Sequence, residues 1–238
     1  KFPSSFDQMV EKGESSFIGI VHIDGNNMGK ISENILKDNK DLISGIKAIR
    51  ELSVVIKNSF FSAFYETIQY LINNSDYIKE KIFKFNEYIP ILPVIYGGDD
   101  LTFVCNGKLA IKFAEKYLSF LTSSIKINEK NYTLSACAGV AIVNSHFPFY
   151  LGYQFAEELC KSAKIKAKSL DPDNPGNWLD YHIIYSGISG GLQSIREREY
   201  NILEAKPDTL GNEFGIESKQ YNLLWRPLKI NDNENKYS

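Results

Sequence analysis

The order of strand-like and helix-like segments predicts an α+β protein with a β-α-β-β-α-β core of the ferredoxin-like type. Apolar residues recur at helical spacing over 42–71 and over 108–124. Four apolar runs have the length and composition of strands: residues 17–23, 90–96, 101–105 and 132–143. In this fold the strands take the spatial order 4-1-3-2, so the first and third strands are antiparallel neighbours in the centre of the sheet.

Each predicted strand carries a feature that indicates its place. The first strand is mostly apolar, as expected in the centre of a sheet, and stops at the turn-rich tetrad 24–27. The second contains Pro90 and Pro93. Because proline cannot donate a backbone hydrogen bond to a neighbouring strand, we expect this strand at an edge. Gly97 and Gly98 then predict a β-hairpin into the third strand. Small residues in the fourth strand permit close helix packing.

The flanking segments extend this core. Asp41 is the expected N-cap of the long helix, and residues 73–87 are polar and lysine-rich, which indicates a surface excursion. A further helix is expected over 150–169 and a final strand over 178–185. We therefore expect three regions: an N-terminal lead-in over 1–16, a catalytic domain over 17–185, and a C-terminal extension over 186–238 that packs on that domain.

Composition excludes several classes of protein. The 238 residues are 43% hydrophobic and 24% charged, which is ordinary for a water-soluble domain, and no apolar run is long enough to cross a membrane. A net charge of −2 gives no overall attraction to nucleic acid. The three cysteines are scattered in apolar segments, which favours a reducing compartment, and we expect a cytoplasmic protein. The chain begins at Lys1 rather than Met, which is typical of an excised domain.

Acidic residues follow the first strand and precede the third. Since these strands are antiparallel neighbours, Asp24 should lie beside Asp99 and Asp100, although the two sites are 75 positions apart. Adjacent residues of a strand face opposite sides, so the turn at Gly97 and Gly98 must bend the chain to bring both carboxylates to one place. Three carboxylates of this kind suit Mg²⁺ or Mn²⁺, which prefer oxygen ligands. The alternative is a surface hairpin with solvated acids.

Basic and amide groups for a phosphate-bearing substrate are also present. On the helix at 150–169, Lys164 and Lys168 lie on one face, where they can contact phosphate; the alternative is a solvated basic face near a helix C-terminus. Gly25 and Asn27, after the first aspartate, can cradle phosphate, or they are ordinary turn residues. His22 is expected to be a packed strand residue. The Trp-Arg-Pro sequence at 225–227 is expected to dock the C-terminal tail rather than clamp a base.

Four segments in order resemble one family. These are IxxIDGNNMGK from residue 20, YGGDDL from 96, SACAGVAI from 135 and AEELCKSAK from 156. They are similar to the palm domain of Cas10-type proteins, the large subunits of type III CRISPR complexes (Cmr2 and Csm1), which are related to GGDEF diguanylate cyclases. The resemblance runs from about residue 17 to 185.

The resemblance implies conversion of ATP into 3′–5′ linked cyclic oligoadenylates, second messengers of antiviral defence. It places metal ions on Asp24, Asp99 and Asp100, near the Gly25 backbone, and phosphate on Lys164. Many members carry aspartate where Asn26 stands, so the metal geometry of the first loop is expected to differ. The histidine-aspartate nuclease signature of the family is absent. Expected partners are a nucleoside triphosphate and either a second copy of the chain or CRISPR effector subunits and RNA.

Two other functions remain open from the sequence. One is a palm that binds nucleotide or docks effector subunits without turnover, because GGDEF-type sites assemble between two protomers. The other is a templated polymerase, which needs a basic channel that the sequence does not indicate. The sequence favours the Mg²⁺-dependent synthesis of a cyclic nucleotide.

Overall fold

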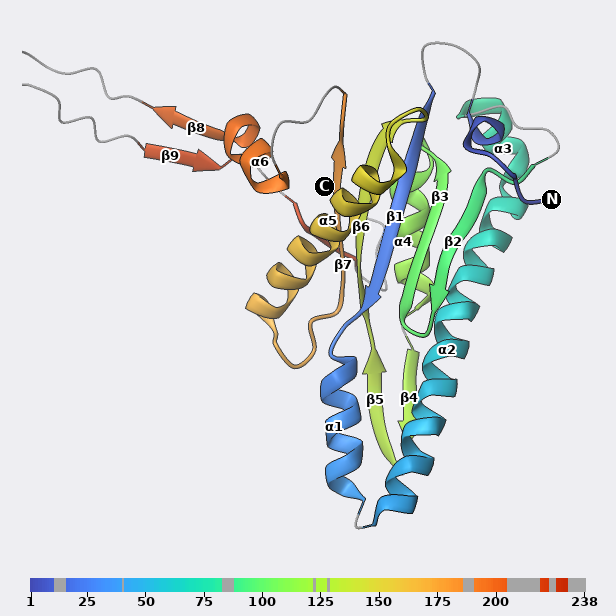
Figure 1. Ribbon diagram of the computed structural model, residues 1–238, viewed down its shortest axis with the longest axis vertical. Helices are drawn as coiled ribbons and strands as arrows, with labels where there is room; N and C mark the ends of the chain where they lie inside the picture. Colours follow the sequence, from blue (N-terminus) through green and yellow to red (C-terminus); the bar gives the residue numbers. More distant parts are fainter. Residues whose placement is uncertain are drawn as a thin grey trace, which may run out of the picture.

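A computed structural model describes residues 1–10, 16–39, 41–82, 88–121, 123–127, 129–185, 191–204, 219–222 and 226–230 of the chain. Its centre is a mixed sheet with the strand order β10-β7-β6-β1-β3-β2 (Figure 1). The strands of this sheet are β1 (Phe17–Gly25), β2 (Ile91–Gly97), β3 (Asp100–Asn106), β6 (Ala136–Asn144), β7 (Asn177–Ile183) and β10 (Leu228–Ile230).

Helices and two separate ribbons complete the fold. The ribbons are β4 (Ser123–Ile127) with β5 (Lys130–Leu134), and β8 (Asn201–Glu204) with β9 (Lys219–Asn222). The helices are the 3₁₀ turn η1 (Phe6–Met9), then α1 (Met28–Asp38), α2 (Leu42–Asn73), α3 (Ser75–Lys81), α4 (Ala110–Phe120), α5 (Phe149–Leu170) and α6 (Leu192–Tyr200). No helix within the described ranges is both long and apolar enough to cross a membrane.

The predicted strand order is confirmed. Strands β6, β1, β3 and β2 stand in the order 4-1-3-2, with β1 antiparallel to both β3 and β6. The proline-bearing β2 is an edge strand, and its register against β3 shifts between Pro93 and Ile95. Beyond β6, the parallel strand β7 and the antiparallel β10 extend the sheet. At β10, the Arg226 guanidinium lies 4.2 Å from the centre of the Tyr181 ring, whereas Trp225 lies outside the described residues.

Two expectations about the elements were wrong in detail. The helix predicted over 108–124 ends at Phe120, and the single strand predicted over 132–143 divides into β5 and β6, because β5 pairs with β4 as a hairpin. The turn of this hairpin contains Glu129 in the left-handed region at φ 67°. The turn separates β4 from β5, which the apolar pattern alone does not predict. In addition, α1 begins directly after the predicted turn 24–27, and the predicted surface excursion at 73–87 contains α3.

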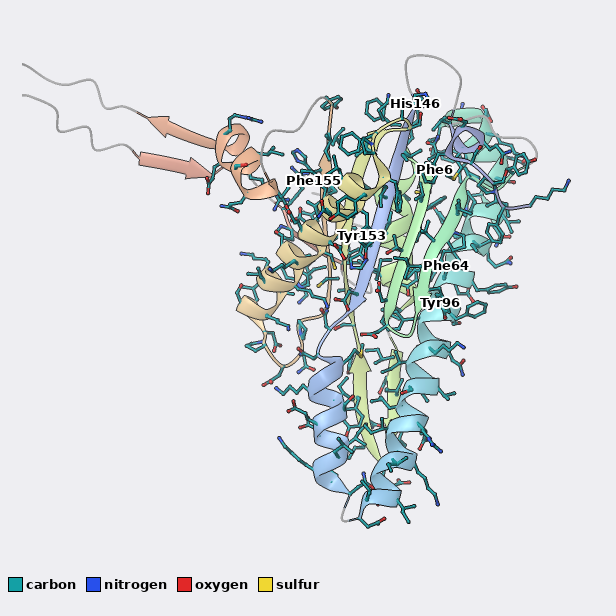
Figure 2. The ribbon with its side chains drawn as sticks, in the orientation of Figure 1. Phe6, Phe64, Tyr96, His146, Tyr153 and Phe155 are labelled. Atoms are coloured by element: carbon teal, nitrogen blue, oxygen red, sulfur yellow. The ribbon has the colours of Figure 1, made fainter. Side chains whose placement is uncertain are left out.

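The two faces of the sheet are covered differently. Helices α2 and α4 cover the face that presents Val21 and Phe103, and α5 covers the opposite face around Ile20 and Val104. Figure 2 shows Phe155 and Tyr153 of α5 over the sheet near β1. The end of β1, the tip of the β2–β3 hairpin and the start of α1 meet at one end of the sheet (Figure 1).

Close contact between α5 and β6 depends on Gly139. A Cβ at this position would lie 2.0 Å from the Ala156 carbonyl oxygen and 2.3 Å from the Cys160 amide nitrogen. Backbone atoms cannot give way, so Gly139→Ala should displace α5 and lower the free energy of unfolding by about 3 kcal/mol. Urea titration measures this loss. The control is Gly29→Ala on α1, where a Cβ meets nothing within 4 Å; equal midpoints for the two variants would contradict the prediction.

Candidate metal and nucleotide site

Strand register places two of the predicted acids opposite each other. In the β1–β3 pair Asp24 stands across from Asp100, and His22 stands across from Thr102. Directly paired residues of antiparallel strands lie on the same face of a sheet. Both carboxylates therefore lie on the α5 side, at the end of β1.

The glycine turn brings the third acid to the same place. Gly97 pairs with Asp100, which leaves a two-residue turn in which Gly98 has φ 65°, a value that glycine adopts without strain. The Gly25 amide donates a hydrogen bond to the Asp99 carbonyl at 3.1 Å. A Cβ on Gly25 would lie 3.0 Å from Asp99 Oδ2, so the absence of a side chain there lets the Asp99 carboxylate lie against the end of β1.

Lys164 reaches this cluster from α5. Its Nζ lies 2.5 Å from Asp24 Oδ2 and 2.9 Å from the Gly25 carbonyl oxygen. Lys168 lies one turn further along α5 and is exposed, and it forms no hydrogen bond or ion pair among the described residues. The structure thus joins Lys164, but not Lys168, to the carboxylates.

Asp100 lies in an electrostatically unfavourable position. Burial raises the pKa of the Asp100 carboxyl; the nearby His22 acts in the opposite direction, and Asp24, Asp99 and Glu157 raise the pKa further. Asp100 Oδ1 is buried without a hydrogen-bond partner in the described part of the chain, and His22 Nδ1 lies 3.5 Å from it. A cluster of carboxylates that repel one another in this way is stabilised by a bound cation.

His22 behaves as the packed strand residue that we expected. It is buried, its Nδ1 lies 3.0 Å from the Thr102 hydroxyl, and its ring meets Tyr153 edge-on with 5.6 Å between centroids. Burial, followed by the neighbouring Glu157, raises the pKa of Tyr153 to about 12. Tyr153 and Glu157 escaped notice in the sequence. Tyr153 lies four residues before Glu157, and Glu157 lies seven residues before Lys164, so this helical spacing marks one face of α5 and is the signal that finds them.

Asn26 has a structural role that the sequence did not reveal. Its side chain is almost fully buried and donates to Ser135 Oγ at 3.1 Å and to the Gly176 carbonyl at 2.9 Å. Its backbone amide donates to the Ser135 carbonyl, and the Cys137 thiol approaches its Oδ1 at 3.4 Å. The turn that follows Asp24 is therefore anchored by the side-chain amide of Asn26, which uses both of its N–H donors.

Asn27 and the two hairpin glycines play different parts. Asn27 lies in the left-handed region at φ 57° and donates its side-chain amide to the Pro172 carbonyl at 3.0 Å, which ties the start of α1 to the loop after α5. Added Cβ atoms on Gly97 and Gly98 would meet nothing within 4 Å. The outer side of the hairpin turn is therefore open to a ligand.

The donor set fits a hard divalent cation by its chemistry. Asp24, Asp99, Asp100 and the Gly25 carbonyl offer only oxygen atoms, and one of these, Asp100 Oδ1, is an unpartnered buried acceptor. Within the described ranges, no three histidine, cysteine or acidic side chains are positioned to coordinate one metal ion together. Lys164 holds Asp24 Oδ2 and the Gly25 carbonyl in this structure. Metal binding by these aspartates stays a prediction.

Comparison with known structures finds the following similar chains. A Csm1-Csm4 cassette in complex with cA4 aligns with a TM-score of 0.45 and 16% identity, over 71% of this chain and 21% of that one. The GGDEF domain of a Pseudomonas aeruginosa protein aligns with a TM-score of 0.39 and 14% identity, over 69% and 83% of the two chains. The GGEEF domain of a Vibrio cholerae diguanylate cyclase gives 0.39 and 15%, over 72% and 85%. No curated protein matches the sequence.

A family description covers more than half of the chain. Residues 17–171 match the second palm domain of Cas10/Cmr2. This range includes β1, Asn27, the β2–β3 hairpin and all of α5, which together carry every residue of the candidate site. The chain therefore belongs to the Cas10/Cmr2 family and has its palm fold.

Proposed function

We propose that the protein is a Mg²⁺-dependent nucleotidyltransferase that makes 3′–5′ linked cyclic oligonucleotides, with ATP as the substrate, as second messengers of CRISPR-type antiviral defence. The observation that carries the proposal is the meeting of Asp24, Asp99 and Asp100 with Lys164 at one end of the sheet, inside a Cas10/Cmr2 palm match. Carboxylates and a lysine at one point are the groups that two-metal nucleotidyl transfer needs.

Each residue of the site has a distinct role in this proposal. Asp24, Asp99 and Asp100 would hold Mg²⁺ or Mn²⁺, and the metal would supply charge neutralisation at the triphosphate and a lowered pKa for a ribose 3′-hydroxyl. The 3′-oxygen of one nucleotide forms a bond to the α-phosphorus of the next, and the bond to pyrophosphate breaks. Lys164, already beside Asp24, would exchange this partner for a phosphate oxygen. Lys168 on the same face is the second phosphate candidate.

Product analysis tests this function. The protein is incubated with each of the four nucleoside triphosphates and Mg²⁺, and the products are resolved by mass spectrometry. We expect cyclic products with one pyrophosphate released per bond formed, and none in the presence of EDTA. ATP is the expected substrate. Linear products that require a template strand would contradict cyclisation and support the polymerase alternative.

A second candidate is a palm that binds nucleotide or docks partner subunits without turnover. The Lys164–Asp24 ion pair favours it, because the lysine holds two of the oxygens that a metal would need. A palm of this kind would act within a type III CRISPR effector or against a second copy of the chain. Calorimetry that detects ATP binding without pyrophosphate release at any protein concentration would support this candidate over the enzyme.

A further inference from the structure

A polar cavity lies behind α1, apart from the carboxylate cluster. It has a volume of about 360 Å³ and is formed by α1, β5 and the loop after α5. Neither the three aspartates nor Lys164 line it. The residues that do are Asn26, Asn27, Lys30, Ile31, Asn34, Asn131, Tyr132, Thr133, Ser135, Asp173, Asn174, Pro175 and Gly176. A volume of this size lies within the range of small-molecule sites.

The lining offers hydrogen bonds of both kinds with little net charge. Lys30 forms an ion pair with Asp173, so the two charges in the wall balance each other. Among the described residues, the side chains of Asn34, Asn131 and Thr133 form no hydrogen bond within the protein. Each asparagine amide presents a donor and an acceptor side by side. The wall therefore suits a neutral ligand whose edge carries donors and acceptors together.

The apolar part of the wall narrows the choice of ligand. Tyr132 contributes an aromatic ring, and Ile31 and Pro175 contribute aliphatic surface. Side-chain amides pair with the donor–acceptor edges of nucleobases, and aromatic rings stack on their faces. A phosphate group would face Asp173 as well as Lys30, which disfavours a charged ligand. The combination fits the base and ribose of an uncharged nucleoside.

We propose that this cavity is a second ligand site, for a neutral nucleoside, beside the turn that follows Asp24. The placement follows from Asn26 and Asn27, which line the cavity and directly follow Asp24 and Gly25. Asn26 joins this loop to Ser135 and Gly176, both of which also line the cavity. A bound nucleoside contacts Asn26, which anchors the turn after Asp24, and does not contact the three aspartates.

Nuclear magnetic resonance of the ¹⁵N-labelled 238-residue chain tests the site. Adenosine, guanosine, cytidine and uridine are titrated separately in EDTA, so that neither metal nor phosphate contributes. For at least one nucleoside we expect saturable shifts of the Asn34 and Asn131 side-chain amides and of the backbone over 131–135 and 173–176. Shifts that do not saturate, or that fall only elsewhere on the protein, would overturn the proposal.

Variants make the test specific. Replacing Asn34 and Asn131 together by alanine removes two hydrogen-bonding side chains and should weaken binding about tenfold or more. Asn58→Ala, which removes an exposed asparagine from α2, is the matched control and should bind as the parent chain does. Equal affinity of the double variant and the control would refute the site. Nucleoside binding should persist in a variant without Asp99 and Asp100, so the result does not depend on the proposed enzyme activity.

Discussion

Replacing Asp99 and Asp100 together by asparagine is expected to lower the rate of pyrophosphate release from ATP by about a thousandfold, which is roughly 4 kcal/mol of transition-state stabilisation. Asparagine has nearly the same shape as aspartate but carries no charge. The two carboxylates lie at the tip of the hairpin, one in register with Asp24 and one against Gly25. Their loss removes two of the three acidic oxygen donors while it preserves the turn.

The same double variant should not be less stable than the parent. The pKa of Asp100 is raised by burial and by the neighbouring acids, so its ionised form is disfavoured in the folded protein. An acid with a raised pKa reduces stability as the pH increases from the unfolded pKa through the folded one, and a neutral amide removes that loss. Urea titration at neutral pH should therefore give an equal or higher midpoint. Pyrophosphate release that persists in a well-folded variant would refute the assignment of these aspartates.

Asn26→Asp is expected to lower the free energy of unfolding by about 3 kcal/mol, the largest effect on stability among the substitutions near the site. The change keeps the size of the side chain but removes both amide donors. It leaves a carboxylate facing the Gly176 carbonyl and the Ser135 hydroxyl in a nearly fully buried position. A charge buried against a carbonyl oxygen has no compensating partner there.

Chemical denaturation with a matched variant measures this effect. Asn34→Asp makes the same chemical change on an exposed position of α1 and should shift the free energy of unfolding by less than about 0.5 kcal/mol. Comparable losses in the two variants would show that Asn26 is not an anchor. The resemblance to Cas10-type proteins pointed to a changed metal geometry at this position, because many members carry aspartate there. That expectation stays a prediction; in this structure the side-chain amide of Asn26 anchors the turn that follows Asp24.

The sequence was sufficient for the strand order and for the meeting of Asp24 with Asp100. The two prolines of β2 restrict it to an edge, and the apolar β1 requires the centre, so few arrangements of the sheet remain. Once β1 and β3 are antiparallel neighbours, register alone places the end of one beside the start of the other. The i, i+4 spacing of α5 likewise led to Lys164, because helical periodicity is a local property.

Tertiary structure alone decided which groups contact those residues. Lys164 pairs with Asp24, whereas Lys168 does not join the cluster. This difference depends on how far α5 extends along the sheet, which a local sequence pattern does not determine. The anchoring of Asn26 joins residues more than a hundred positions apart, and the cavity behind α1 combines three segments that are remote in the chain. Local sequence determined the strand order and the acids, because side-chain alternation and turn chemistry act over a few residues. Long-range packing determined what surrounds the acids, because contacts between distant segments exist only in the folded chain.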